Sequence, residues 1–404
     1  GFKIFDNTTN KPDLKKFIED TTLTKNIEMK NINSKTYKRY NFITSNDDEK
    51  NKNIIKSLIR EMNICRHIQF NYYNDYSKYL VEVVDIYYNK IATTNKKDQK
   101  LFFELEECLF GNLKDLLKYE NKGKKINFEK YTKFKFLLDI IKGLIFLHDL
   151  NISHNNLDLS SIYIDYCYKK ENNDLYEKDK KKNQIKDLIK SILKKEEKTI
   201  YKLLEQLQEN PYKKKDIKNK LIEDSHQNYS NLYLQAKIGD FNCATFLFEP
   251  EDELDAKISK KTDFEIDCIS SKLDYKLPEL SNKNYTDKTD IYYFALLAIQ
   301  LFADDNKIKT KKIKKIKDIK YINKKDLSKI FEDDKNLDNS EKKEYEKLFT
   351  NLIIKCLSPD EIDRPDYKTI LKVLKMKFTE SLLKKYKTNQ GISVNLELLG
   401  LKKP

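Results

Sequence analysis

A polar stretch in the middle of the chain decides the fold: His148-Asp-Leu-Asn-Ile-Ser-His154-Asn-Asn-Leu-Asp-Leu-Ser-Ser-Ile-Tyr-Ile164. Before it, apolar residues recur every three or four positions from Phe134 to His148, which is typical of one face of a long helix. Its last residues, 162–164, have the composition of a short strand. A second stretch, Lys237-Ile-Gly-Asp-Phe-Asn242, completes another β run over residues 232–238. The sequence therefore predicts a helix, a polar loop and a strand, and far along the chain a second strand that leads to an aspartate.

The residues on either side of this stretch predict different kinds of structure. On the N-terminal side, strand-like runs surround one helix at residues 51–66, where Ile54, Leu58, Met62 and Cys65 repeat as a buried stripe. The strand-like runs cover residues 25–44 (strand, turn, strand), 79–88 and 100–105. On the C-terminal side the patterns are helical, with a buried helix over residues 291–302 and further helices in 340–404. This order predicts an α+β chain.

Composition narrows the class of protein. The chain has 404 residues, a net charge of +14 (79 − 65) and only 7 glycines, whereas average usage gives about 28 in a chain of this length. The shortage disfavours a dinucleotide fingerprint or a Walker loop. No apolar run approaches the ~18 residues of a membrane span. The 6 cysteines form no C-x-x-C pair, so we expect reduced thiols in a cytosolic-type compartment rather than a disulfide framework or a zinc site.

Two lysine-rich segments bear on possible partners. Residues 169–230 carry 17 Lys and 12 acidic groups, which predicts a partly helical, charged surface insert. Residues 307–325 carry ten Lys and one Asp. Such runs are usually solvated faces. The alternative is nonspecific contact with nucleic acid or an anionic membrane, or binding of an acidic protein.

Several motifs resemble those of the protein kinase family. The 148–164 stretch resembles the catalytic loop, H-R-D-L-K-x-x-N-I, and Lys237–Asn242 resembles the K-I-G-D-F-G strand and metal motif. Further pieces follow the family's order: Arg60-Glu61-Met62 on the N-terminal helix, Glu106 to Leu113 at the hinge, Leu277-Pro278-Glu279, Asp290 before the buried helix, and Cys356 to Arg364-Pro365.

The resemblance covers roughly residues 15–375 and implies a bilobal protein-kinase-like fold. The implied N-lobe, residues 1–109, is small and β-rich with one helix. The implied C-lobe, residues 110–404, is large and mainly helical. It holds the charged, Lys-rich insert at 169–230, the Lys-rich segment at 307–325 and a C-terminal tail at 380–404.

The same resemblance implies where the chemistry should lie, and four positions depart from it. Asn156 stands where the family has its catalytic aspartate, and an amide cannot accept a proton at neutral pH. Asn155 replaces the arginine that pairs with a phosphorylated loop. Asp158 replaces the lysine that faces the transferring phosphate, and Ser161 replaces a metal-holding asparagine. We therefore expect no catalytic residues and a pseudokinase, that is, a scaffold or allosteric regulator that acts through protein–protein contacts, with a kinase or an acidic protein as partner.

The implied nucleotide site is incomplete. No glycine occurs in residues 18–28, where the phosphate loop should lie. The remaining candidates are the pair Lys38 and Glu61 (with Lys35 and Arg39 as alternatives to Lys38) and the metal aspartate Asp240. No cofactor is required in this interpretation. The alternative is an unorthodox active Ser/Thr protein kinase that transfers phosphate from ATP, with Asp240 as Mg²⁺ ligand and Asp158 as base.

The residues that fit the family best are structural. His154 and Phe241 are expected to stack in a hydrophobic column, with Cys65 above them. Glu279 and Arg364 are expected to form a buried ion pair. Asp290 is expected to cap its helix and to brace the backbone of the polar loop. Asn242, which follows Phe241 in place of glycine, is a residue type that tolerates left-handed backbone.

Overall fold

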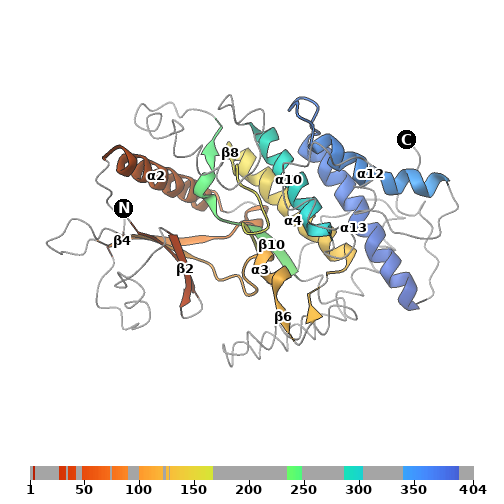
Figure 1. Ribbon diagram of the computed structural model, residues 1–404, viewed down its shortest axis with the longest axis horizontal. Helices are drawn as coiled ribbons and strands as arrows, with labels where there is room; N and C mark the ends of the chain where they lie inside the picture. The colour runs from red at the N-terminus through yellow and green to blue at the C-terminus, as the bar shows by residue number, and fades with distance from the viewer. Residues whose placement is uncertain are drawn as a thin grey trace. The chain divides into compact units, whose positions relative to one another are not determined.

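The computed structural model describes the chain in separate ranges: residues 3–4, 27–32, 35–41, 48–72, 75–89, 100–121, 124–126, 128–166, 234–247, 286–303 and 340–390. The chain divides into two compact units (Figure 1). The first unit consists of residues 1–108, 143–156 and 238–290, and the second of residues 109–142, 157–237 and 291–404. Glu279, residues 169–230 and residues 307–325 lie outside the described residues, so the predictions for them stay predictions.

A five-stranded sheet belongs to the first unit, in the order β1-β4-β5-β3-β2. Its strands are β1 (Lys3–Ile4), β2 (Ile27–Ile32), β3 (Lys35–Asn41), β4 (Val83–Asn89) and β5 (Lys100–Leu105). β1 runs parallel to β4, and the other neighbours are antiparallel. The strands predicted within residues 25–44 and at 100–105 are confirmed. The strand predicted from residue 79 begins instead at Val83, because Ser77–Tyr79 form a 3-10 turn, η1, and Leu80 pairs with Ile238.

The long helix among the described residues 1–108 is α2, Asp48–Phe70, which confirms the helix predicted at 51–66 and extends it at both ends. Met62 and Cys65 are buried, as the predicted stripe requires. α2 packs against β4 and against the short elements η4 (Phe241–Cys243) and β11 (Thr245–Phe246). The ring of His67, at the end of the helix, meets the ring of Phe246 edge-on at 5.7 Å.

At Gly143, α4 (Lys130–Asp149) comes close to the Tyr79 backbone and to the side chains of Leu80 and Ile238. A Cβ at this position would lie 2.9 Å from Ile238 Cδ1, 3.1 Å from the Tyr79 carbonyl oxygen and 3.3 Å from Leu80 Cδ2. The missing side chain therefore allows α4 to pack directly on the Tyr79–Leu80 backbone and on the end of β10 (Leu234–Ile238).

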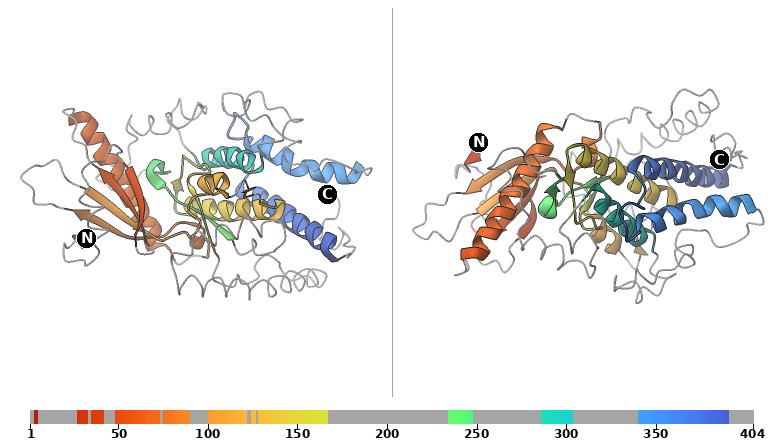
Figure 2. Two further views of the ribbon diagram at one scale, coloured as in Figure 1. Left: turned by 60° about the horizontal axis from the view of Figure 1, so that its bottom comes forward. Right: turned by 90° about the horizontal axis from the view of Figure 1, so that it is seen from above.

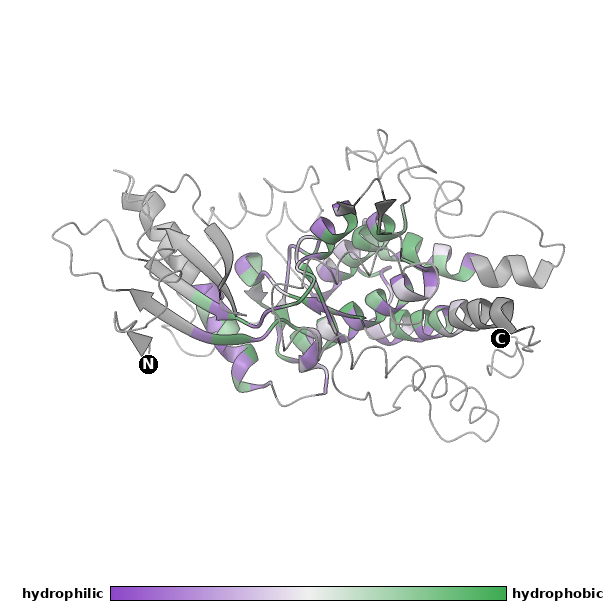
Figure 3. Cartoon of the chain, turned by 90° about the horizontal axis from the view of Figure 1, so that it is seen from below, coloured by the Kyte–Doolittle hydropathy of each residue, from purple (hydrophilic) through white to green (hydrophobic). Residues whose placement is uncertain are grey.

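Helices make up most of the second unit. α10 (Asp287–Phe302), α12 (Ser340–Cys356) and α13 (Tyr367–Gln390) join the first part of α4, and a short α3 (Leu113–Lys118) precedes them. α12 and α13 lie side by side (Figure 2). Hydrophobic residues alternate with hydrophilic ones along these helices (Figure 3). Phe134 of α4, Phe302 of α10 and Phe349 of α12 meet with ring centroids 5.0 to 5.9 Å apart, so one aromatic cluster joins three helices.

The helix predicted to end at His148 is present as α4, and the apolar residues of its predicted stripe are buried or half-buried. Burial extends beyond that stripe, because the charged residues Lys135 and Asp139 are buried as well. They form an ion pair of 2.8 Å, and Asp139 also accepts a hydrogen bond from the Ala236 backbone N–H. The pairing satisfies the buried charges, which is what allows a charged side to lie inside the unit.

The described elements form a mixed α+β structure, which confirms the predicted class at that level. None of the described helices is both long enough and apolar enough to cross a bilayer. Cys65, Cys108, Cys243 and Cys356 are buried, and none of these four described cysteines is in a disulfide. Cys167 and Cys268 lie outside the described residues.

Candidate functional site

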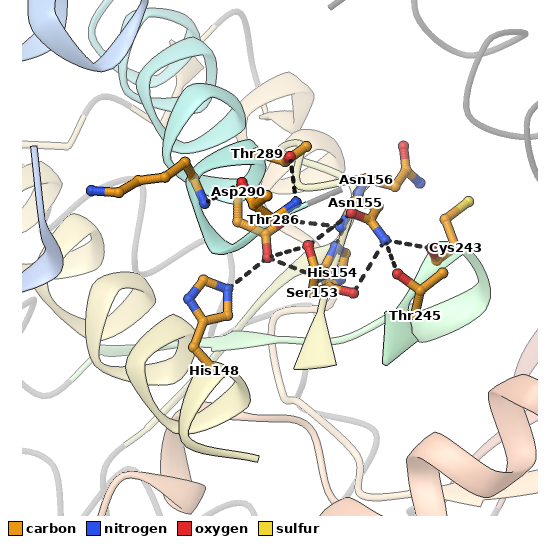
Figure 4. Close-up of polar contacts among 11 residues, drawn as sticks. His148, Ser153, His154, Asn155, Asn156, Cys243, Thr245, Thr286, Thr289 and Asp290 are labelled. Carbon is orange, nitrogen blue, oxygen red and sulfur yellow. Dashed lines mark hydrogen bonds and ion pairs between the residues drawn. The ribbon is translucent and has the colours of Figure 1, made fainter. Parts of the chain in front are cut away.

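The centre of the candidate site is the carboxylate of Asp290, which is fully buried in the first turn of α10. Oδ2 accepts hydrogen bonds from His148 Nε2 at 2.9 Å, from the His154 backbone N–H at 2.8 Å and from Ser153 Oγ at 3.1 Å. Oδ1 accepts one from the Asn155 backbone N–H at 2.9 Å. Figure 4 shows these donors converging on the carboxylate from the end of α4 and from β8, Ile152–Ser153. We call Asp290 with these four donors the Asp290 hub.

Opposing effects set the pKa of Asp290. Burial alone raises the pKa of this carboxyl. The hydrogen bond from His148, the electrostatic interactions with His148 and His154, and the His154 backbone N–H outweigh burial and lower the pKa below the ordinary value of 3.8. Asp290 is therefore an anion whose two oxygens are both held by donors.

The predicted brace between Asp290 and the loop backbone is present, but the predicted cap is wrong. α10 begins at Asp287, and Asp290 is its fourth residue. The cap is Thr286, whose Oγ accepts from the Lys288 N–H at 3.2 Å, while Thr289 Oγ accepts from the Thr286 N–H at 3.2 Å. This reciprocal pair satisfies the first backbone donors of the helix and leaves the Asp290 carboxylate for the hub.

His154 lies next to the hub and is fully buried. Its ring meets the ring of Phe241 edge-on at 5.6 Å, the contact that the sequence predicted for these two residues. Nδ1 accepts from the Asn156 backbone N–H at 3.3 Å, and Nε2 lies 3.0 Å from the Gly239 carbonyl oxygen. Because a carbonyl only accepts, this pattern assigns the ring proton to Nε2 and uses both ring nitrogens for structure.

The side chains of Asn155 and Asn156 are both buried but differ in their hydrogen bonds. The Asn155 side chain is fully buried and bonded to Ser153, Cys243 and Thr245. The Asn156 side chain is also buried, with 4% of its surface exposed, but no hydrogen bond joins it to any residue that the structure describes. Asn156 is thus an uncharged amide in an enclosed place, with no ionisable group of its own.

Asp158 and Ser161, in the second unit, close a turn on themselves. Asp158 Oδ1 accepts from the backbone N–H groups of Ser160 at 2.8 Å and Ser161 at 3.1 Å. Ser161 Oγ donates to the Asp158 carbonyl at 2.9 Å and accepts from the Asp158 N–H at 3.1 Å. The turn therefore engages Asp158 Oδ1 and Ser161 Oγ in local hydrogen bonds and fixes the orientation of the Asp158 carboxylate.

Asp240, and not Asn242, adopts the left-handed backbone after β10, with φ at 63°. Asn242 lies within η4, where its carbonyl accepts from the buried Arg60 guanidinium at 3.3 Å. Asp240 is half-buried and makes no hydrogen bond that caps η4. An aspartate tolerates this conformation better than most residues because its short side chain leaves room for the following carbonyl.

The remaining predicted contacts are described only in part. Glu61 is buried on α2. Lys38 lies on β3 opposite Phe103 of β5, but its side chain lies outside the described part of the structure, so the Lys38–Glu61 pair stays a prediction. Arg364 is buried, donates through Nε to the Ser358 carbonyl at 2.9 Å and lies over the Tyr292 ring at 5.2 Å. Its predicted partner Glu279 is not among the described residues.

The sequence did not assign roles to His148, Ser153 or Thr245. One signal in the sequence could have indicated their roles. His148 ends an apolar stripe and Ser153 follows apolar Ile152, and a polar residue in a buried run needs a hydrogen-bond partner. Within the described residues, no group of three or more His, Cys, Asp or Glu side chains could hold a metal ion. No family model matches the chain, and no curated protein does either.

Proposed function

We propose that the chain is a protein-kinase-like domain of the bilobal type that is catalytically impaired, a pseudokinase that acts as a scaffold or allosteric regulator through protein–protein contacts. The observation that carries the proposal is the identity and surroundings of Asn156. Phosphoryl transfer by this family needs a carboxylate to orient the attacking hydroxyl. Asn156 supplies only an amide, and it is buried with 4% of its surface exposed.

The Asp158–Ser161 turn supports the same conclusion. The backbone N–H groups of Ser160 and Ser161 both bind Asp158 Oδ1 and hold the carboxylate in one orientation. Hydrogen bonds to a charged group are each worth about 1.5–3 kcal/mol. As a base, Asp158 would have to act through Oδ2 in this fixed orientation or lose these bonds, which weighs against the alternative of an active kinase that uses Asp158.

Two features support the kinase-like part of the proposal. Among the described residues, residues 1–108 hold a sheet and the long helix α2, and residues 291–404 are helical, which agrees with the β-rich and helical character that the motifs imply for these two parts of the chain. The first unit also takes in residues 143–156 and 238–290, which the motifs assign to the C-lobe. The Asp290 hub and the His154–Phe241 ring contact use motif residues for architecture. The motif residues expected to be structural are thus in contact with one another. At the positions expected to be catalytic, the chain has the amide of Asn156 and the Asp158–Ser161 turn.

The direct test is phosphate transfer by the full 404-residue chain. We expect no transfer of the γ-phosphate from Mg²⁺-ATP to the chain itself or to general protein substrates. We also expect no Mg²⁺-ATP-dependent rise in Tm, whereas a ligand at 100 times its Kd would stabilise the folded state by about 2.7 kcal/mol. Transfer that disappears in Asp240→Ala would overturn the proposal in favour of an active kinase.

A variant that restores the missing carboxylate separates the effect of Asn156 from the effect of the Asp158–Ser161 turn. Asn156→Asp restores the carboxylate but leaves the Asp158–Ser161 turn in place, so we expect it to stay inactive. Asn156→Gln is the matched control, because it changes the same buried side chain without adding a charge. Transfer by Asn156→Asp alone would show that the turn is no obstacle to catalysis.

A further inference from the structure

Asn155 combines an unusual backbone conformation with a fully used side chain. Its φ of 59° lies in the left-handed region, which asparagine tolerates better than most residues. Oδ1 lies 2.7 Å from Ser153 Oγ and shares the single hydroxyl hydrogen of Ser153 with Asp290, while Nδ2 donates to the Cys243 carbonyl at 3.2 Å and to Thr245 Oγ1 at 2.8 Å. The amide thus connects the loop after β8 to the residues on both sides of Ala244 (Figure 4).

The strand next to the Asn155 side chain, β11, is too short to be stable through its own backbone pairing. β11 contains only Thr245 and Phe246, which pair with Ser153 and Ile152 of β8. One further backbone bond, from the Leu247 N–H to the Asn151 carbonyl at 2.7 Å, follows this pairing. Even a complete two-stranded hairpin is only marginally stable in water, so contacts outside the strand pairing, namely the Asn155 hydrogen bonds and the packing of α2 on η4 and β11, hold this segment in its closed position.

We propose that Asn155 is a conformational latch that holds residues 243–247 closed on β8, and that this segment opens as a local unit when the latch is lost. The latch is an uncharged amide within the chain, so the closed position needs no phosphate or other added charge. The proposal stands on these hydrogen bonds and is independent of the proposed function. It is stated for the first unit alone, which contains all four residues of the latch.

A matched pair of variants tests the latch. Asn155→Gly removes the side chain and keeps a residue that accepts positive φ. Asn151→Gly makes the same change at a second left-handed asparagine, with φ at 56°, in the same loop. The Asn151 side chain is exposed, and no described hydrogen bond depends on it. Both variants add the same backbone freedom, so their difference reports on the hydrogen bonds of Asn155.

The measurement is amide hydrogen exchange of the full chain at residues 244–247, with the core of α4 as an internal reference for global unfolding. In Asn155→Gly we expect exchange at 244–247 to be about 10- to 100-fold faster, with the α4 amides unchanged. In Asn151→Gly we expect less than a threefold change. Equal exchange in the two variants, or acceleration spread equally over α4, would overturn the proposal.

Thr245 provides a second test that leaves the backbone of Asn155 untouched and also serves if Asn155→Gly fails to fold. Thr245→Val removes the hydroxyl acceptor with little change of shape, and Thr245→Ser keeps it. We expect faster exchange at 244–247 in Thr245→Val and less of an effect in Thr245→Ser. The same exchange rate in both variants would contradict a latch through this hydroxyl.

Discussion

Replacing Asp290 with asparagine tests whether the hub stabilises the protein through its charge and its number of acceptors. The carboxylate accepts three donors at Oδ2 and one at Oδ1, all at 2.8 to 3.1 Å. An amide has only one acceptor oxygen. With that oxygen at the Oδ2 position, the NH₂ group faces the Asn155 N–H, and this buried donor loses its acceptor.

The cost follows from these contacts. One orphaned buried N–H costs about 1–3 kcal/mol, and three bonds that change from charge-assisted to neutral lose about 1 kcal/mol each. Relief of the desolvated charge offsets part of this sum. We expect a net loss of about 3–5 kcal/mol, a large share of the ~5–15 kcal/mol that stabilises a typical fold.

Urea unfolding provides the assay. The chain has no Trp and 26 Tyr, so tyrosine fluorescence and far-ultraviolet circular dichroism follow the transition. With an m-value of about 3 kcal/mol per M, the midpoint should fall by roughly 1–1.7 M. Asp287→Asn, in the same helical turn but only half-buried, is the control and should cost under about 1 kcal/mol. Equal midpoints for the two variants would refute the hub as a source of stability.

Three other predictions concern pH, packing and a buried guanidinium. The pKa of Asp290 is lower in the folded chain than the ordinary 3.8, so its contribution is complete above pH 3.8 and is lost as the pH falls through the folded value. The urea-midpoint gap between wild type and Asp290→Asn should therefore narrow below pH 3.8, and a constant gap would contradict the shift. Gly143→Ala places a Cβ 2.9 Å from Ile238 Cδ1. The resulting strain of about 1–3 kcal/mol should exceed the ~1 kcal/mol gain in helix propensity, so Tm should fall rather than rise. Arg364→Lys removes the Nε bond to Ser358 and the planar contact with Tyr292. It should cost about 2 kcal/mol in urea unfolding, whereas Lys368→Arg, exposed on α13, should leave the midpoint unchanged.

The sequence predicted most elements, because each one has a local pattern. The strand at 100–105 has the predicted ends, and the helices at 51–66 and 291–302 are present with longer ends. The burial of α4 beyond its apolar stripe could not be predicted, for a physical reason. Apolar spacing shows which residues are buried, but it does not show that an ion pair between Lys135 and Asp139 allows the other side to be buried too.

The hub was predictable only in outline. The motifs implied that Asp290 braces the loop, but the side chains that complete it, His148 and Ser153, lie 142 and 137 residues away in sequence. Tertiary packing, rather than local preference, selects such partners. The left-handed backbone at Asp240 was not predicted from the sequence, which indicated only that Asn242 would tolerate such a conformation. Asparagine favours that conformation locally, but the end of β10 requires it at Asp240.

The sequence separation within the hub has a consequence for the protein during its synthesis. The donors at residues 148–155 leave the ribosome 135 to 142 residues before their acceptor at 290. At ~5–20 residues per second, the delay is about 7–28 s. During that time the His154 and Asn155 N–H groups lack the acceptor that they have in the folded chain, because Asp290 has not yet been made. The translation rate over residues 156–290 therefore determines how long the residues around β8 are present in the nascent chain before the Asp290 carboxylate can bind them.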